Sequence, residues 1–150
     1  SLIEERIRLY THLATEKNIH FKINCQETSV VLFDTPRIEQ VLDNLLTNAI
    51  KFSPVGGVIE IIMESGKGYI RVTITDEGPG IKSENLDDLF KPFKKIESDS
   101  TKDEKGTGLG LAIAKKMIEL HNGTLTFKPS KNQGASFSFK LPANPSSFQP

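Results

Sequence analysis

The sequence predicts an α+β fold, a two-layer α/β sandwich with about three main helices on one face of a mixed, largely antiparallel sheet. One reason is the order of the elements that the hydrophobic periodicity predicts. This order is helix, two strands, helix, two strands, a long polar segment, helix and two strands. The other is size, because 150 residues with 37% hydrophobic content can bury one core.

The first predicted element is an amphipathic helix over residues 2–17. Its apolar residues recur at helical spacing. They are Ile3, Ile7, Tyr10 and Ala14. The short apolar segments 19–24 and 30–33 then predict two strands.

The strongest helical pattern covers residues 35–52, with Pro36 in the first turn, where proline is tolerated. At about 100° per residue, Asn44, Asn48 and Lys51 fall on one side of this helix, beside its apolar arc. Two amides and an amine in one stripe suggest an oxygen ligand for Mg²⁺ and a cation for phosphate. A solvated helix side explains the same residues, and both interpretations stay open at this point.

Residues 58–64 and 69–75 predict strands around a glycine-containing hairpin at 65–68. A short helix is expected over 83–90. Residues 94–107 are polar and charged with one aliphatic residue, and they predict a mobile loop.

The last helix is expected over residues 109–121, with Gly123 near its C′ position. Residues 124–128 and 135–141 alternate apolar and polar side chains and complete the sheet. Residues 142–150 are the expected C-terminal tail.

Charge and composition exclude several classes of function. Lys and Arg total 19, as do Asp and Glu, so no net field favours nucleic acid or an anionic membrane. The single cysteine excludes an internal disulfide and a cysteine cluster for a metal. The sequence has no apolar run long enough to span a membrane and no visible signal peptide.

Asp76 follows the strand at 69–75 and has the parity of its apolar face, so its carboxylate is expected to point inward. A buried carboxylate needs hydrogen-bond donors. An exocyclic amine of a ligand would supply one, with Gly78 and Gly80 forming a tight turn that lets a flat ring approach. An ordinary Asx turn before Gly78 is the structural alternative.

Three alternate glycines, Gly106, Gly108 and Gly110, precede the helix at 109–121. Glycines at a helix N-terminus let a phosphate approach the free N–H groups. The run differs from the dinucleotide-binding fingerprint, which needs glycine where Leu111 stands, and the chain has no Walker A motif. A flexible hinge is the alternative.

Together, four segments resemble the motifs of the ATP-binding catalytic domain of sensor histidine kinases. This domain belongs to the superfamily of DNA gyrase, the heat-shock chaperone ATPase and MutL-type repair proteins. The asparagine box is matched by RIEQVLDNLLTNAIKFS and the first glycine box by DEGPGI. The phenylalanine box is matched by LFKPFKK and the second glycine box by KGTGLGLAIAKKMIELHNG. The resemblance extends from about Leu2 to Leu141 and implies the Bergerat ATP-binding fold.

The resemblance implies ATP and Mg²⁺ as ligands, with residues 94–107 as the ATP lid. It implies Asn48 as the metal ligand, Asn44 and Lys95 as catalytic residues, and Asp76 as the acceptor for the adenine amine. The residues implied to contact the nucleotide are Asn44, Asn48, Lys51, Phe52, Asp76, Gly78, Gly80, Ile81, Phe93, Lys95, Gly106, Thr107, Gly108, Leu109, Gly110 and Leu111.

Two departures from the family pattern affect the expected function. Lys95 stands where the family often has arginine, and lysine cannot form a bidentate fork with phosphate. The family's phosphoacceptor histidine is followed by an acidic residue and proline, whereas His12 precedes LATE and His20 precedes FKIN. The acceptor histidine is therefore expected on a separate dimerisation domain, absent from this chain.

The expected function is that of a protein-histidine kinase of a two-component system, incomplete without its phosphoacceptor domain and with a response regulator downstream. Asn44 occupies the place of the acidic general base of gyrase-like relatives, and an amide cannot take that proton at neutral pH. This favours phosphoryl transfer over hydrolysis. The resemblance divides the chain into a helix that follows the dimerisation domain (1–17), the ATP-binding domain (18–141) and a tail (142–150).

Three alternatives stay open at this stage. They are a serine kinase or anti-sigma-factor relative with the same nucleotide site, a nucleotide-sensing module without transfer, and an α+β domain with coincidental glycines. We expect no nucleic-acid partner, no membrane contact by this segment, a monomeric chain and a cytoplasmic location. Membrane anchoring of the full-length protein is left open.

Overall fold

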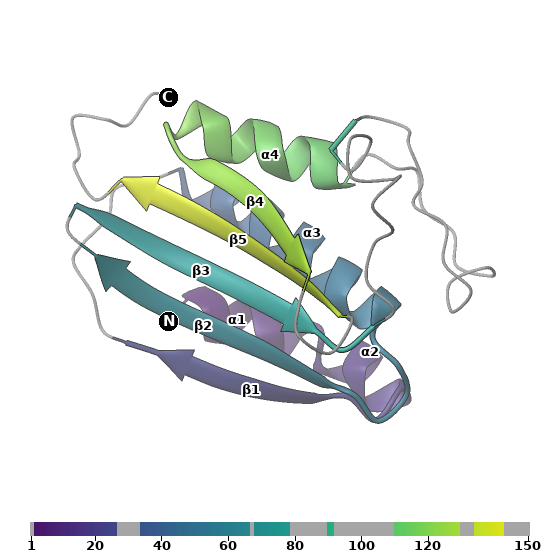
Figure 1. Cartoon of the computed structure of the whole chain (residues 1–150). Helices are drawn as coiled ribbons and strands as arrows, with labels where there is room; N and C mark the ends of the chain where they lie inside the picture. The colour runs from purple at the N-terminus through teal and green to yellow at the C-terminus, as the bar shows by residue number, and fades with distance from the viewer. Residues whose placement is uncertain are drawn as a thin grey trace.

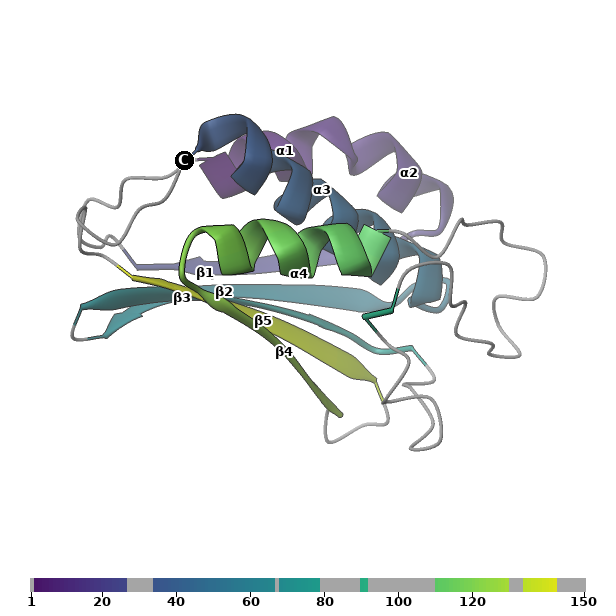
Figure 2. The same ribbon diagram turned by 90° about the horizontal axis from the view of Figure 1, so that it is seen from above.

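The computed structural model describes residues 2–26, 34–66, 68–78, 90–91, 110–129 and 134–142. These residues form two layers, a twisted sheet and a set of helices that covers one of its faces (Figures 1 and 2). The helices are α1 (Leu2–Leu9), α2 (Thr11–Glu16), α3 (Thr35–Phe52) and α4 (Gly110–Leu120). The strands are β1 (His20–Cys25), β2 (Val58–Gly66), β3 (Tyr69–Asp76), β4 (Thr124–Pro129) and β5 (Ala135–Pro142).

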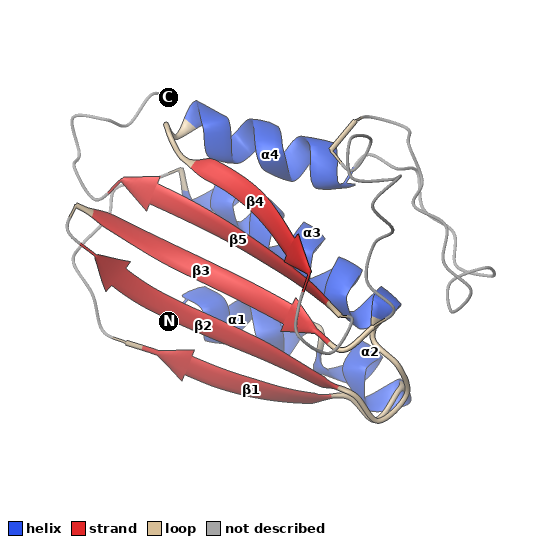
Figure 3. Ribbon diagram, viewed as in Figure 1, coloured by secondary structure: helices blue, strands red, loops and turns tan. Residues whose placement is uncertain are grey.

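The sheet has the strand order β1-β2-β3-β5-β4 (Figure 3). β1 and β2 run parallel, and α3 lies between them in the chain. The other neighbouring strands run antiparallel. The predicted fold class, a mixed and largely antiparallel sheet with helices on one face, is therefore confirmed.

The core lies between the sheet and the helices. Among the described helices, α3 contributes the most residues to the core, because seven of its residues are buried along one face. They are Ile38, Val41, Leu42, Leu45, Leu46, Ala49 and Ile50. These side chains pack with the inward-facing residues of the strands in one cluster, and burial of this apolar area is the main stabilising term.

The N-terminal helix is broken, in contrast to the single helix predicted over residues 2–17. Tyr10 separates α1 from α2 and has φ −105° and ψ 7°, outside the helical region. Its N–H group bonds to the carbonyl of Ile7, three residues back. The break still leaves Ile3, Ile7 and Ala14 buried in the common core, so both short helices pack onto the domain.

α4 ends differently from the prediction at Gly123. The left-handed residue is Asn122, at φ 60°. The N–H groups of Asn122 and Gly123 bond to the carbonyls of Glu119 and Ile118, which is a Schellman motif. Gly123 is required for another reason, because a Cβ atom there would collide with the carbonyl of Lys140 on β5.

Several predicted elements fall on residues that the structure does not describe. They are the strand at 30–33, nearly all of the helix at 83–90 and the loop at 94–107. Of the predicted tail, only Pro142 is described, as the last residue of β5. Among the described helices, none has the length and apolar character needed to cross a membrane.

Candidate functional site

α3 carries the first part of the candidate site. Asn44, Asn48 and Lys51 lie on one side of it, as their spacing requires. All three are partly buried and border the arc of α3 that packs into the core. The polar stripe predicted at the edge of the buried face is therefore present in the structure.

Asn44 faces the N-terminus of α4. A Cβ atom built on Gly110, the first residue of α4, would lie 3.7 Å from both Cγ and Oδ1 of Asn44. Among the described residues, the buried Nδ2 atom of Asn44 has no hydrogen-bond partner. A buried donor without an acceptor costs about 1–3 kcal/mol, and a helix N-terminus attracts anions. The two features together suit a ligand oxygen of negative charge.

Asp76 forms the second part of the site, at the end of β3. The residue is 2% exposed, and its carboxylate Oδ1 accepts a hydrogen bond of 2.8 Å from the N–H group of Gly78. Burial raises the pKa of Asp76 to about 6, although hydrogen bonds from the backbone of Gly78 and Ala135 act in the opposite direction. The predicted inward orientation is confirmed, and the Asx turn with Gly78 is present as well.

The turn after β3 touches the end of α3. A Cβ atom on Gly78 would collide with the carbonyl oxygen of Phe52, the last residue of α3, and would lie 2.9 Å from Oδ1 of Asp76. Only glycine allows this close approach. The contact brings the C-terminal end of the Asn44 helix to the buried carboxylate.

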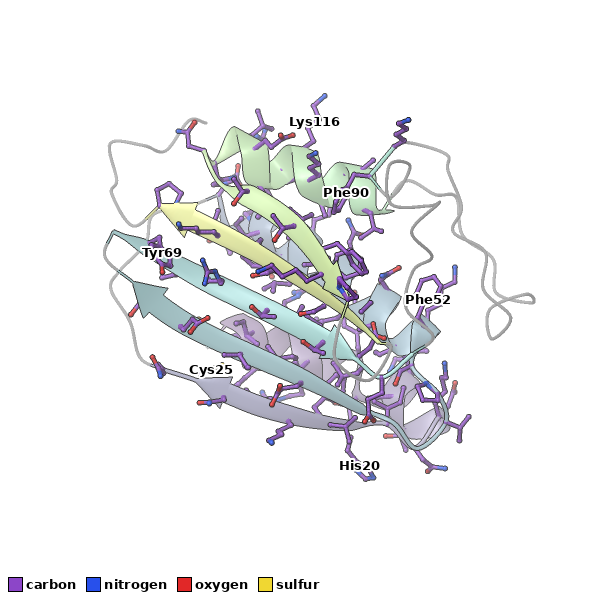
Figure 4. The ribbon with its side chains drawn as sticks, viewed as in Figure 1. His20, Cys25, Phe52, Tyr69, Phe90 and Lys116 are labelled. Atoms are coloured by element: carbon purple, nitrogen blue, oxygen red, sulfur yellow. The ribbon has the colours of Figure 1, made fainter. Side chains whose placement is uncertain are left out.

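Two aromatic side chains on this side of the molecule each carry a lysine over the ring. Figure 4 shows Phe52 and Phe90 on the side of the molecule where β3 ends. Nζ of Lys51 lies 5.6 Å from the centre of the Phe52 ring, and Nζ of Lys115 lies 5.2 Å from the centre of the Phe90 ring. These are cation–π contacts, and among the residues that the structure describes neither ammonium group forms an ion pair with a carboxylate.

A hydrogen bond links the far ends of α3 and α4. The N–H group of Asp34, the N-cap of α3, donates to Nε2 of the buried His121 at 3.0 Å. Nδ1 of His121 lies 2.8 Å from the carbonyl of Met117 in α4. The two helices that meet at Asn44 and Gly110 are thus also joined at their other ends.

Eight of the predicted nucleotide contacts can be located in the structure. Asn44 lies beside Gly110, Phe52 lies against Gly78, and Gly78 donates a hydrogen bond to Asp76. Asn48 and Lys51 lie along α3, and the partly buried Leu111 packs against the core. The other predicted site residues lie outside the described residues. They are Gly80, Ile81, Phe93, Lys95, Gly106, Thr107, Gly108 and Leu109.

The structure adds two lysines that the sequence did not single out. The first is Lys115, on α4 beside Phe90. The sequence did not indicate this contact, because it depends on the packing of two segments that are distant in sequence. Lys17 is the other, and its ammonium group contacts the last turn of α3. Pro54 was the one local signal for such a contact, since it removes an N–H group just beyond α3.

Comparison with known proteins identifies the class to which this fold and site belong. Residues 33–145 match the family of histidine kinase-, DNA gyrase B- and HSP90-like ATPases. The chain belongs to this family.

Within the family, the chain is similar in sequence to several histidine kinases. It is 35% identical over 139 residues to the hybrid signal transduction histidine kinase D of Dictyostelium discoideum, covering 89% of this chain and 9% of that protein. It is 33% identical over 145 residues to the sensor histidine kinase WalK of Bacillus subtilis, covering 95% and 23%. The chain thus spans less than a quarter of the length of these relatives.

A solved structure of the catalytic domain of the histidine kinase ThkA matches nearly end to end. The TM-score is 0.85 at 33% identity, and the match covers 97% of this chain and 93% of that one. The chain is therefore homologous to the catalytic domain of sensor histidine kinases.

Proposed function

We propose that this chain is the ATP-binding catalytic domain of a two-component sensor histidine kinase. It transfers the γ-phosphoryl group of ATP to a histidine on a separate dimerisation domain, and a response regulator acts downstream. The observation that carries the proposal is the arrangement of α3, whose middle meets the N-terminus of α4 at Asn44 and whose end meets the buried Asp76 turn at Phe52.

The Asp76 end suits an adenine ring. A buried carboxylate at neutral pH is a hydrogen-bond acceptor, and the exocyclic amine of adenine is a donor. Guanine presents a carbonyl oxygen at the corresponding position, which would face the carboxylate as a second acceptor. The site should therefore prefer ATP to GTP, because an unpaired buried polar group opposes binding.

The Asn44 end suits the phosphates. Its Nδ2 atom lacks an acceptor among the described residues, Gly110 at the start of α4 carries no side chain beside it, and Lys51 supplies a positive charge on the same side of α3. In this proposal Gly106 and Gly108 extend the same N-terminus, and Lys95 and the segment 94–107 close over the phosphates.

Mg²⁺ fits this end of the site. The described residues hold no group of three His, Cys, Asp or Glu side chains able to bind a metal by themselves. The amide oxygens of Asn48 and Asn44 are hard donors, and Mg²⁺ commonly takes few protein ligands and completes its shell with water and phosphate. When bound, the ion neutralises phosphate charge. Asn48 is the residue that we assign to hold it.

The reaction requires little covalent chemistry from this chain. A nitrogen of the acceptor imidazole forms a bond to the γ-phosphorus as the bond to the bridging oxygen of ADP breaks. The side chains of this domain orient the phosphates and offset the charge on the oxygens. Asn44 cannot act as a general base at neutral pH, which disfavours activation of water and hydrolysis.

Incubation of the chain with γ-labelled ATP and the histidine-bearing domain of its full-length protein tests this function. We expect label on the partner in a form that acid removes, since a phosphorus–nitrogen bond is acid-labile. Acid-stable label would identify a serine kinase instead. ATP binding without any transfer would favour a nucleotide-sensing module.

A further inference from the structure

We propose that Lys17 is a positioning residue for the adenine end of the nucleotide site, acting through the last turn of α3. The inference rests on the proposed function and adds a residue from outside the four sequence motifs. Lys17 directly follows α2, in the N-terminal segment that sequence analysis set apart from the ATP-binding domain.

The ammonium group of Lys17 binds two backbone carbonyls at the C-terminal end of α3. Its Nζ atom lies 2.8 Å from the carbonyl oxygen of Ile50 and 3.1 Å from that of Lys51. The last four carbonyls of a helix have no partner within the helix. A cation at this end also opposes the negative pole of the helix dipole. Lys17 therefore satisfies two acceptors that the helix leaves open.

The sequence leaves the carbonyl of Ile50 without a helical donor. An α-helical bond to the carbonyl of Ile50 would come from the residue four positions later, which is Pro54 and has no N–H group. Ser53 is already extended, at φ −71° and ψ 142°, so the chain has left the helix before that point. The backbone of Lys17 adds a second tie, since its carbonyl accepts a 2.7 Å bond from the N–H group of Gly56.

The same turn supports the buried carboxylate. It carries Lys51 and Phe52, and the carbonyl oxygen of Phe52 is packed against Gly78. The N–H group of Gly78 in turn donates to the carboxylate of Asp76. A continuous series of contacts thus runs from Lys17 through the end of α3 to the proposed adenine acceptor. Displacement of this turn would change the position of Gly78 and with it the hydrogen bond to Asp76.

Lys17→Met tests the role, because methionine keeps the length of the stem and removes the ammonium group. We expect ATP to bind about tenfold more weakly in calorimetry at a temperature where the variant is folded. We also expect the amide resonance of Gly78 to shift in the nucleotide-free chain. Lys17→Arg should restore both, since the guanidinium also donates to carbonyl oxygens.

Lys22→Met is the matched control. Lys22 lies on β1 with its side chain 73% exposed, and its contact with Glu60 is 3.7 Å long. Loss of this charge should change neither ATP affinity nor the Gly78 resonance. If Lys17→Met does not fold, Lys17→Gln, which keeps a neutral donor, replaces it with the same expected directions.

An affinity within about twofold of the unaltered chain, with an unshifted Gly78 resonance, would overturn the role of Lys17. A lower melting temperature with unchanged affinity would also overturn it, because the contact would then be purely structural. If the unaltered chain binds no ATP, the proposed function fails. The Gly78 resonance then still decides whether Lys17 positions the turn.

Discussion

The carbonyl oxygen of Phe52 occupies the space that a Cβ atom of Gly78 would need. The end of α3 and the turn after β3 are therefore in direct backbone contact. This contact joins the helix that carries Asn44 and Asn48 to the buried carboxylate of Asp76. The position of the proposed phosphate end relative to the proposed adenine end of the site therefore depends on this backbone contact.

Gly78→Ala should disrupt this contact. The added methyl group must displace the end of α3, at a cost in unfolding free energy of about 1–3 kcal/mol, and ATP affinity should fall as Asp76 moves. Urea unfolding and calorimetry measure the two effects. Gly68→Ala is the control, because Gly68 has φ 79° and nothing within 4 Å of an added Cβ. That variant should lose about 1 kcal/mol to backbone strain and bind ATP normally.

Asp76→Asn should remove one pH-dependent contribution to the free energy of unfolding and should also weaken ATP binding. The folded-state pKa of Asp76 is about 6, against 3.8 for the ordinary group, because burial disfavours the charged form. The folded state then binds more protons than the unfolded state between these values, so stability falls as pH rises through 6. From pH about 4.5 to about 7.5 this group should remove about 2 kcal/mol.

Asp76→Asn cannot titrate and should lack this part of the pH dependence. Urea unfolding of both proteins at the two pH values measures it, since contributions from other groups cancel in the comparison. The variant should also bind ATP at least about a hundredfold more weakly, because an amide N–H₂ can face the adenine amine. Near-normal ATP affinity would show that Asp76 is not the adenine acceptor.

Asn48→Ala should remove the effect of Mg²⁺ on ATP binding while leaving the domain folded. The substitution deletes the amide oxygen and is mildly favourable for an α-helix. Calorimetric titration with ATP, with and without Mg²⁺, measures the difference. Asn24→Ala, at an exposed position of β1, is the matched control and should keep the Mg²⁺ dependence. An unchanged Mg²⁺ response in Asn48→Ala would reject the ligand role.

Arg6 should stabilise the packing of α1 on α3. Its guanidinium donates to both carboxylate oxygens of Asp43, at 2.9 and 2.7 Å, and to Glu39 at 2.7 Å. The hydrogen bond with Asp43 is the main cause that raises the pKa of Arg6. The pairs are partly buried and bidentate, so Arg6→Met should cost about 1–2 kcal/mol of unfolding free energy.

Arg6→Lys should recover only part of this loss, because an ammonium group cannot form the two parallel bonds to Asp43. Arg8→Met, at an exposed position of the same helix, is the control and should change stability by less than about 0.5 kcal/mol. Equal stability of Arg6→Met and Arg8→Met in urea unfolding would show that the contacts of Arg6 with Asp43 and Glu39 do not stabilise the domain.

The parts of the site that follow local periodicity could be predicted from the sequence. The stripe of Asn44, Asn48 and Lys51 follows from helical geometry, and the inward orientation of Asp76 follows from strand parity. These rules relate residues within one element, and each element was recognisable from its apolar pattern. The fold class followed from the order of the elements.

The contacts between elements could not be predicted in this way. Lys17 bonds to carbonyls 33 and 34 residues later, and Arg6 bonds to Asp43, 37 residues later. Nothing local determines which cation reaches which acceptor. Pro54 leaves the carbonyl of Ile50 without a helical donor, but nothing in the local sequence determines that Lys17 provides one. The break at Tyr10 was hidden for a similar reason, because the apolar spacing is nearly helical across it.

Titration of the 150-residue chain with ATP and with GTP, each with and without Mg²⁺, tests the central claim most directly. We expect saturable binding of ATP that Mg²⁺ alters, and no measurable binding of GTP under the same conditions. Equal binding of the two nucleotides would contradict the assignment of Asp76 to the adenine amine, and binding of neither would contradict the nucleotide site itself.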